Sequence, residues 1–478
     1  MRLLLINPCN PLVNISSIRN HWSKYRVWKP LGLLVLAGLT PSEWDITIVD
    51  ENLGLADFEK MPRPDLVGIS AFTSQAPRAY ELAANFRSRE IPVVMGGIHA
   101  TMRPAEASAR VDSVVMGEAE SVWANVLEDA KQGALKPLYT GSHEPMEKTP
   151  FPRHDLLPSG YYFGSIQTTR GCPLNCSFCS VSAFNGKAYR HRPIEDVVAE
   201  FKMIREKQVL VVDDNLIGTR RDHIARAKKL FRAMIDANLG KRWIAQATIN
   251  MGDDEELLQL AAKAGCAGVF IGFETTRDEG LIEVRKQYNI QKGHDLKASV
   301  QRIHRHGILV VGSFIMGLDV DRSGIGREIA DTANRYGVDA INVMFLTPLP
   351  GTDLWNTMEE KDRIAAHTFP EDWKYYTLTL PVSHYHHLSR EEIINEMHSC
   401  NQSFYSLAGI LRRTGRTFLK SHNAFLSLVC NLSYRKNTHL GQKVHWEFNR
   451  ALDQFQLNRQ LPATGKNLHI CAPRRNAV

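Results

Sequence analysis

The chain has 478 residues, a length that indicates about three domains at roughly 150 residues per domain. Hydrophobic residues make up 44% and charged residues 23% of the sequence, which is globular composition and excludes a disordered, collagen-like or coiled-coil protein. The net charge is +7, but residues 404–478 hold twelve Lys and Arg against only Glu447 and Asp453. The positive charge therefore belongs to the carboxyl-terminal part, and the residues before it carry a small negative net charge.

The amino-terminal decapeptide MRLLLINPCN has a short apolar run that Asn7 and Pro8 interrupt, which predicts a first strand rather than a signal peptide. No stretch approaches the about 18 uninterrupted apolar residues of a membrane-spanning helix. Eight cysteines are too few for a disulfide scaffold in a chain of this length. We therefore expect a cytoplasmic protein in a reducing compartment.

Residues 1–135 alternate short apolar runs with segments of helical length, which predicts a doubly wound, Rossmann-like parallel sheet. The predicted strands are residues 2–8, 45–51, 66–72, 92–99 and 112–118, and the predicted helices are residues 31–39, 76–89, 104–110 and 121–130. Such sheets bind ligands at the carboxyl ends of their strands. The loops there contain Thr73, Ser74, Gln75, Gly96, Gly97, His99 and Gly117.

Residues 136–164 are polar, rich in proline and without periodicity, which indicates a linker. A second series of alternating strands and helices fills residues 165–351, with strands expected at 165–171, 209–214, 243–250, 268–275, 308–317 and 341–350. Six units are fewer than the eight of a closed barrel, so we expect a partial, open (β/α)6 barrel similar to a TIM barrel. Residues 352–478 read as a mostly helical carboxyl-terminal region.

Three cysteines, Cys172, Cys176 and Cys179, follow the first strand of the second series in the string TTRGCPLNCSFC. Thiolates at these spacings can converge on one inorganic centre, whereas structural zinc and most iron–sulfur sites use four protein ligands. The next cysteine, Cys266, lies far along the chain at a junction between helix and strand. A centre with an open metal position is therefore one interpretation. A zinc site completed by His191, or three thiols gathered by chance, are the others.

The Cys-x-x-x-Cys-x-x-Cys spacing, with Phe178 before the last cysteine, resembles the signature of the radical S-adenosylmethionine (SAM) superfamily. The resemblance implies a partial barrel and a 4Fe–4S cluster on the three cysteines. It also implies cleavage of iron-bound SAM to a 5′-deoxyadenosyl radical that abstracts hydrogen from an unactivated carbon. An external one-electron reductant of the flavodoxin or ferredoxin kind is then required, and Arg170 could balance the charge of the cluster. By the same resemblance the SAM-binding residues are Phe178, Asp213, Asp214, Asn215, Glu274, Gly312 and Gly317.

A Gly-Gly-x-His-x-Thr pattern from Gly96 and a Gly-Glu-x-Glu pattern from Gly117 resemble the cobalamin-binding domain that precedes the barrel in cobalamin-dependent radical SAM enzymes. The first loop lacks the Asp-x-His-x-x-Gly motif whose histidine ligates cobalt in other cobalamin domains, so no lower ligand is predicted. A related domain that only packs against the barrel is the alternative. The resemblance implies a cobalamin site that consists of Ser70, Thr73, Ser74, Gly96, Gly97, His99, Gly117 and Glu118.

The carboxyl-terminal region contains two candidate recognition features. An aromatic and histidine-rich segment that includes Trp373, Tyr375 and His384 could line a substrate pocket or form a packed loop. A basic face formed by Arg412, Arg416 and Lys420 beside apolar residues is typical of a membrane-surface helix. The same face could bind an anionic substrate or be solvated, and the scarcity of interleaved aromatic residues makes nucleic acid an unlikely partner. We expect a chain without residues 404–478 to retain SAM cleavage.

The leading hypothesis is a cobalamin-dependent radical SAM enzyme that methylates an unactivated carbon of a lipid or secondary metabolite. A radical SAM cyclase, or an enzyme of oxidative rearrangement in natural-product biosynthesis, is the second hypothesis. A non-catalytic protein that binds a structural metal and senses a cofactor is the third. Methylthiotransfer is disfavoured, because that group has three further cluster cysteines in its amino-terminal domain and only Cys9 is present here.

Overall fold

The first sheet of the computed structural model has six parallel strands in the order β2-β1-β3-β4-β5-β6. The structure describes residues 1–12, 29–291, 295–420 and 424–460. The strands are β1 (Arg2–Asn7), β2 (Asp45–Asp50), β3 (Leu66–Ser70), β4 (Val93–Gly96), β5 (Ser113–Met116) and β6 (Leu138–Thr140). The helices are α1 (Leu31–Leu39), α2 (Ala76–Ser88), α3 (Gly97–Met102), α4 (Pro104–Ser108) and α5 (Trp123–Lys131).

The two faces of this sheet belong to separate hydrophobic cores, because successive side chains of a strand point to opposite faces. Leu3 and Leu5 pack with Leu34 of α1 on one face, whereas Leu4 and Ile6 belong to the core that contains α2. Burial on both faces accounts for the nearly continuous apolar runs of the strands. The predicted doubly wound sheet is confirmed.

The sheet includes one strand that lies in the predicted linker. Strand β6 pairs in parallel with β5, so the first sheet continues beyond residue 135. Only Tyr139 of its three residues is buried, and the flanking residues Leu138 and Thr140 are exposed. A strand this short and polar has no periodic signal, which is why the sequence analysis placed it in a linker.

The second sheet also has six parallel strands, in the order β14-β13-β12-β11-β10-β7. They are β7 (Gly164–Ile166), β10 (Gln208–Val211), β11 (Arg242–Ala247), β12 (Cys266–Glu274), β13 (Leu309–Met316) and β14 (Ala340–Phe345). The helices between them are α7 (Ile194–Met203), α8 (Arg221–Asp236), α9 (Glu255–Lys263), α10 (Asp278–Glu283), α11 (Tyr288–Gln291), α12 (Leu296–Arg305) and α13 (Ile325–Tyr336). The sheet is open between β14 and β7, as expected of a partial barrel.

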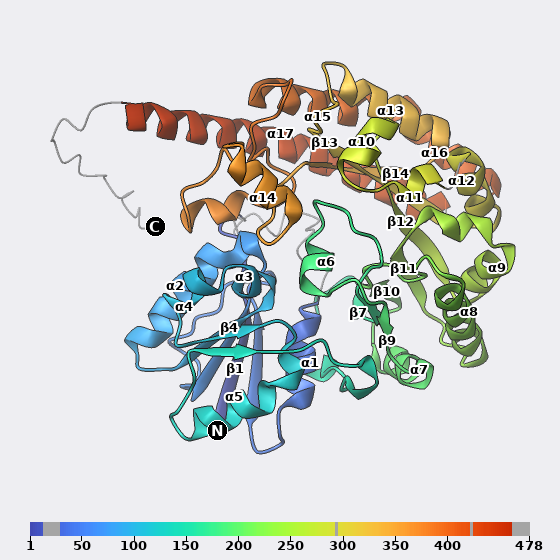
Figure 1. Ribbon diagram of the computed structural model, residues 1–478. Helices are drawn as coiled ribbons and strands as arrows, with labels where there is room; N and C mark the ends of the chain where they lie inside the picture. The colour runs from blue at the N-terminus through green and yellow to red at the C-terminus, as the bar shows by residue number, and fades with distance from the viewer. Residues whose placement is uncertain (13–28, 292–294, 421–423, 461–478) are drawn as a thin grey trace, which may run out of the picture.

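The carboxyl-terminal helices are α14 (Asp353–Glu360), α15 (Arg390–Phe404), α16 (Leu407–Lys420) and α17 (Ala424–Gln460). Figure 1 shows the first sheet at the lower left, the barrel at the right and these helices across the top. Trp355 of α14 and Trp373 belong to the same hydrophobic core as α2 of the first domain and Ile315 of the barrel. The chain after the barrel therefore returns to fill the junction between the two sheets. None of the described helices is long and apolar enough to span a membrane.

The basic carboxyl-terminal helices cover the open edge at β14. The Tyr405 hydroxyl donates to the carbonyl oxygen of Ile341 (2.7 Å) and accepts from its N–H (2.9 Å). Asn431 of α17 donates to the Asp339 carbonyl oxygen (2.9 Å). An edge strand needs such partners for its free backbone groups. Residues from 404 onward therefore pack on this edge of the barrel, and retention of SAM cleavage without them stays a prediction.

We predict that a Tyr405→Phe substitution lowers the free energy of unfolding by about 1–3 kcal/mol, because two buried backbone groups of Ile341 lose their partner. Urea unfolding followed by circular dichroism measures the effect. Tyr375→Phe is the matched control, since no hydrogen bond of the Tyr375 hydroxyl is found in the described part of the chain. Equal unfolding midpoints for Tyr405→Phe and the wild type would contradict the assignment of Tyr405 as the cap of this edge.

Candidate functional site

The three cysteines lie on one loop, residues 171–189, which we call the cysteine loop. Its two ends are tied together by the short antiparallel strands β8 (Thr169–Arg170) and β9 (Arg190–His191). The loop starts with Gly171 at φ +84°, where an added Cβ would lie 2.2 Å from the carbonyl oxygen of Ala188. Only glycine fits a left-handed backbone at so close an approach, which explains the Arg-Gly-Cys order of the sequence.

Asp213 and Asp214, which follow β10, hydrogen-bond to this loop and to the residues just before it. The buried carboxylate of Asp213 accepts from the Thr168 N–H (2.5 Å) and from the hydroxyls of Thr168 (2.6 Å) and Thr169 (2.9 Å). Asp214 accepts from the Gly171 N–H (2.9 Å) and from Asn185 Nδ2 (3.0 Å). Burial raises the pKa of both carboxyl groups. Both oxygens of Asp213 and Oδ2 of Asp214 bind the loop and its flanks, which gives the two residues a positioning role, and their contact with SAM stays a prediction.

The thiols of the cysteine loop are suited to bind a cationic centre. Burial raises the pKa of all three, that of Cys176 to about 12, and the nearby Cys172 further raises the pKa of Cys176 and of Cys179. A buried thiolate needs adjacent positive charge, which the irons of a cluster supply. Within the described ranges, no three His, Cys, Asp or Glu side chains are already arranged around a single metal position. The loop nevertheless fits a 4Fe–4S cluster by its donor chemistry, because cysteine thiolates are the ligands of such clusters.

A buried ion pair adjoins the thiols. Lys286 Nζ contacts Glu274 Oε1, and both side chains are over nine-tenths buried. Burial opposes the charge on Lys286, but Glu274 and the thiols outweigh it and raise the pKa of the ammonium. A Cβ on Gly272 would lie 2.2 Å from Glu274 Oε1, so the glycine leaves the space that the pair occupies. An ammonium and a carboxylate beside the cysteine loop match the carboxylate and amino groups of SAM in charge.

Glu274 is one of the predicted SAM contacts, whereas Lys286 was not predicted. The signal for Lys286 was weak, because a single lysine after a short helix is usually solvated. Asn215, another predicted SAM contact, is buried, and its Nδ2 lies 3.4 Å from Thr248 Oγ1. Its amide lies near the Cys172 thiol and acts to lower the pKa of that thiol. Asn215 therefore lies at the cysteine loop.

The two predicted glycines of the fifth barrel strand are packing residues. A Cβ on Gly312 would meet the rings of Phe314 (3.1 Å) and Phe273 (3.3 Å), on the side of β13 that faces the helices. A Cβ on Gly317, at φ +107°, would lie 2.4 Å from the ring of Tyr385. Neither position presents a side-chain surface to the inside of the barrel. Contact of their backbones with an adenine stays a prediction.

The residues predicted for cobalamin lie at the carboxyl ends of β3, β4 and β5. Ser70, Ser74, Gly96, Gly97 and Gly117 are partly exposed there, and Thr73 is buried. The Gly117 N–H donates to the hydroxyl of Thr101 (3.0 Å), which in turn donates to the Gly97 carbonyl oxygen (2.9 Å). A row of small, partly exposed polar residues at this edge fits the approach of a large nucleotide-like tail.

His99 lies apart from this edge. Its ring is fully buried, with Nε2 2.9 Å from the Tyr80 hydroxyl and its face 5.5 Å from the ring of Trp373. Glu106 accepts from the Tyr80 hydroxyl (3.0 Å) and from Trp373 Nε1 (3.0 Å). This polar group holds the first domain against the segment after the barrel, so the geometry gives His99 a structural role.

The two domains meet through a buried ionic network. Glu118, just after β5, pairs with Arg170 Nη1 (3.2 Å) and accepts from Arg190 Nη1 (2.8 Å). Arg170 also pairs with Glu120 Oε1 (2.6 Å). These arginines face each other across β8 and β9 at the base of the cysteine loop. Arg170 was expected to balance the charge of the cluster, and carboxylates of the first domain neutralise it. Glu118, a predicted cobalamin contact, forms ion pairs with both arginines. Arg190 and Glu120 were not predicted.

The three candidate substrate residues are not brought together as one pocket. Trp373 is fully buried and stacks on Phe369 at 3.7 Å between ring centroids. Tyr375 packs edge-on against Phe448 of α17, and His384 is exposed. Trp373 is therefore part of a packed loop. A role of Tyr375 and His384 in substrate binding stays a prediction.

Comparisons with known proteins place these features in families. Residues 166–325 match the model of the radical SAM superfamily, and residues 24–127 match that of the B12 binding domain. Relatives of similar sequence are bacteriochlorophyllide d C-12(1)-methyltransferase of Chlorobaculum tepidum (29% identical, 80% of this chain and 84% of the relative) and hopanoid C-2 methylase of Rhodopseudomonas palustris (27%, 70% and 65%). The anaerobic magnesium-protoporphyrin IX monomethyl ester cyclase of Rubrivivax gelatinosus is 26% identical over 85% of this chain and 77% of the cyclase.

A solved structure shares the fold. The radical S-adenosylmethionine methyltransferase TsrM from Kitasatospora setae, with cobalamin and a [4Fe–4S] cluster bound, superposes with a TM-score of 0.60 at 20% identity, covering 77% of this chain and 78% of TsrM. The radical SAM match contains the cysteine loop and strands β10 to β13, and the B12 match contains strands β2 to β5. The chain contains a radical SAM domain and a B12-binding domain, two kinds of domain that bind a 4Fe–4S cluster with SAM and cobalamin, respectively.

Proposed function

We propose that this protein is a cobalamin-dependent radical SAM methyltransferase that acts on an unactivated carbon, with Cys172, Cys176 and Cys179 as the cluster ligands. When bound, the cluster supplies the electron for SAM cleavage and cobalamin supplies a methyl carrier. Glu274 and Lys286 orient SAM by their charges. Asp213, Asp214 and Asn215 hold the loop that carries the thiols.

One observation carries this proposal: the cysteine loop lies against the edge of the first sheet where doubly wound sheets bind their ligands. Helix α3, directly after β4, contacts helix α6 (Ser180–Phe184), directly after Cys179. Phe178 packs against the core that joins the two domains. A methyl carrier and a radical source must face a common substrate, and this junction brings their sites together.

The substrate class that we propose is a largely apolar small molecule, a lipid or a secondary metabolite. The methylases among the relatives are named for a bacteriochlorophyllide and for hopanoids, which supports this class. Apolar side chains of the barrel mouth, Ile315 and Leu346, share a core with Met95 of the first sheet, so the junction itself is apolar. We further propose a cytoplasmic location and electron supply by a flavodoxin- or ferredoxin-like protein.

A second candidate is a radical SAM cyclase or rearrangement enzyme, which the similarity to the magnesium-protoporphyrin ester cyclase favours. We expect SAM with a deuterated methyl group to place deuterium in the product, because a methylase must transfer that group. Mass spectrometry of the product with a trial tetrapyrrole or polycyclic lipid reports the result. A product that forms without gaining the label would replace methylation by cyclisation or rearrangement.

We predict that Cys176→Ala abolishes the brown colour of anaerobically purified protein and reduces 5′-deoxyadenosine formation to background. The loss follows because two thiolates cannot replace three around the cluster. Iron content and the yield of 5′-deoxyadenosine under reducing conditions are the measurements. Cys430→Ala on α17 is the control, since Cys430 lies outside the cysteine loop. Retention of the cluster and of SAM cleavage in Cys176→Ala would show that Cys176 is not a cluster ligand and would contradict the assignment of this loop as the cluster site.

We predict that Lys286→Met weakens SAM binding by about tenfold or more while the cluster is retained, because the methionine keeps the length of the side chain but loses its charge. Equilibrium dialysis with SAM and the iron content separate the two effects. Lys241→Met, a partly buried lysine that donates to backbone carbonyls at the opposite end of the barrel, is the matched control. Unchanged SAM affinity in Lys286→Met would show that the lysine serves only as the partner of Glu274.

A further inference from the structure

Helix α16 presents an apolar stripe to solvent. Leu407, Leu411 and Phe418 have relative exposures of 61%, 69% and 75%. At about 100° per residue these three side chains fall within roughly 40° of one another around the helix. Phe425, near the start of the adjacent helix α17, is 79% exposed. Side chains of this size aligned on a helix face mark an interaction surface rather than scattered exposed residues.

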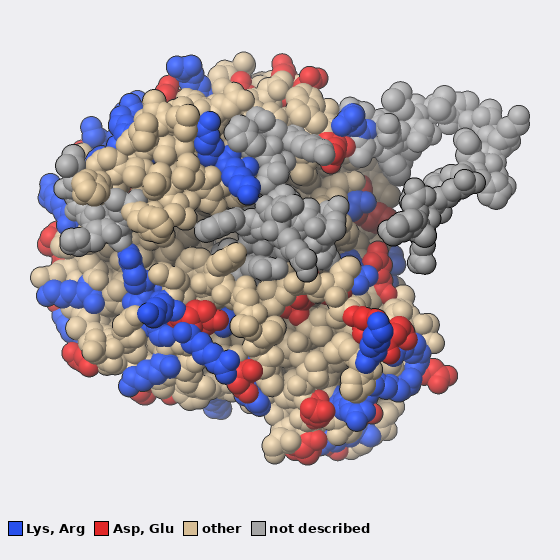
Figure 2. Space-filling view, turned by 180° about the vertical axis from the view of Figure 1, so that it is seen from behind, with Lys and Arg blue, Asp and Glu red and all other residues tan. Residues whose placement is uncertain are grey.

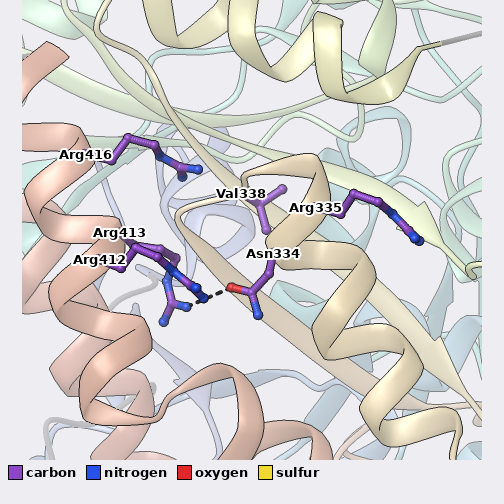
Figure 3. Close-up of a pocket in the computed structure, with 6 residues that line it drawn as sticks. All are labelled: Asn334, Arg335, Val338, Arg412, Arg413 and Arg416. Atoms are coloured by element: carbon purple, nitrogen blue, oxygen red, sulfur yellow. Dashed lines mark hydrogen bonds between the residues drawn. The ribbon is translucent and has the colours of Figure 1, made fainter.

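The other side of α16 lines an arginine-rich cavity of about 400 Å³ against α13. Figure 3 shows Arg412, Arg413 and Arg416 reaching from α16 toward α13, while Arg335 extends away from them. Arg413 is 3% exposed, and its partners among the described residues are amide oxygens, those of Asn431 (2.8 Å) and Asn334 (3.2 Å). Arg416 donates to the carbonyl oxygen of Gly337. Three cationic groups thus converge on one opening.

These cations lack a full set of counter-charges. Asp339 is the carboxylate that acts on Arg413 and Arg416, but its oxygens bind His304, Thr417 and the N–H of Val310. No ion pair of Arg412 or Arg413 is found within the described residues. Burial lowers the pKa of Arg413 to about 10, a sign that an anion would stabilise its charged form. The cavity is therefore complementary to a phosphate group.

The surroundings extend this complementarity. Residues 397–446 contain seven Lys and Arg and no Asp or Glu. Figure 2, the view from behind, shows an uncharged tan area in the upper part of the molecule that is bordered mainly by blue side chains. A second copy docked by a two-fold axis would set these arginines against each other with no carboxylate between them. Anionic lipid offers both the apolar layer for the stripe and the phosphates for the arginines.

We propose that α16 and the start of α17 form a docking surface for a bilayer that contains anionic phospholipid, with the exposed Arg412 contacting a headgroup phosphate. The stripe enters the boundary between headgroups and acyl chains, and Arg412, one residue after Leu411, lies at headgroup level. Neither turnover nor a bound cofactor enters this argument, so it stands independently of the proposed methyl transfer.

Co-sedimentation of the full-length, cofactor-reconstituted protein with vesicles tests the surface. We expect binding to vesicles that contain phosphatidylglycerol, little binding to pure phosphatidylcholine vesicles, and release at high salt. Arg412→Glu should weaken binding by more than about fivefold, since each basic residue near such a surface contributes roughly that factor. The Leu411→Ser, Phe418→Ser double variant should weaken it by at least as much, because two inserted side chains are lost.

Matched controls lie on the first domain, far from α16 in the chain. Lys60→Glu reverses an exposed charge, and Leu55→Ser removes an apolar side chain that is 58% exposed. Both should bind vesicles as the wild type does, and circular dichroism verifies that every variant is folded. Equal binding to both vesicle types, no binding at all, or binding that the α16 variants leave unchanged would overturn the proposal. A concentration-dependent dimer that the double variant abolishes would assign the stripe to a second copy instead.

Discussion

The structure depends on one buried carboxylate, Glu118, which neutralises two arginines at the base of the cysteine loop. Arg170 and Arg190 are direct partners across β8 and β9, and two adjacent guanidinium groups repel each other unless an anion lies between them. The anion comes from the first domain, so contact between the two domains stabilises the paired strands at the base of the cysteine loop. Removal of one member of a buried ion pair costs about 3–5 kcal/mol, which is enough to couple the fold of the loop to the position of the first sheet.

This coupling explains the arrangement of the other polar groups. Asp213 and Asp214 fix the loop from the barrel side, and Glu118 fixes it from the first sheet. The loop is therefore held at both ends and from two domains before any cofactor binds. Such preorganisation matters for a radical enzyme, because the reactive carbon must meet the radical source without access of water.

The sequence predicted most of the fold because the strands of both parallel sheets are mainly apolar runs, whereas the short strand β6 has no periodic signal. It also predicted that the cysteines share a loop. It could not predict which polar side chains face the site. Asp213 and Asp214 follow the same strand, and only the structure shows that both bind the loop, whereas Glu274 meets Lys286. Gly312 faces the helices because strand alternation places it there, and alternation is invisible in a strand that is apolar throughout.

The structure shows where the basic residues of the carboxyl-terminal region lie relative to the cysteine loop. The arginine cavity lies beside Val338 and Asp339, which precede β14, whereas the cysteine loop follows β7 and so lies at the carboxyl ends of the barrel strands. In a parallel sheet these are opposite ends, so a bilayer docked at α16 would not face the barrel mouth. Docking would hold the enzyme near a membrane without delivering substrate directly from it. Binding of a lipid substrate and docking to a lipid surface therefore involve different parts of this chain. The apolar junction beside the cysteine loop concerns the substrate, and the exposed stripe of α16 concerns the surface.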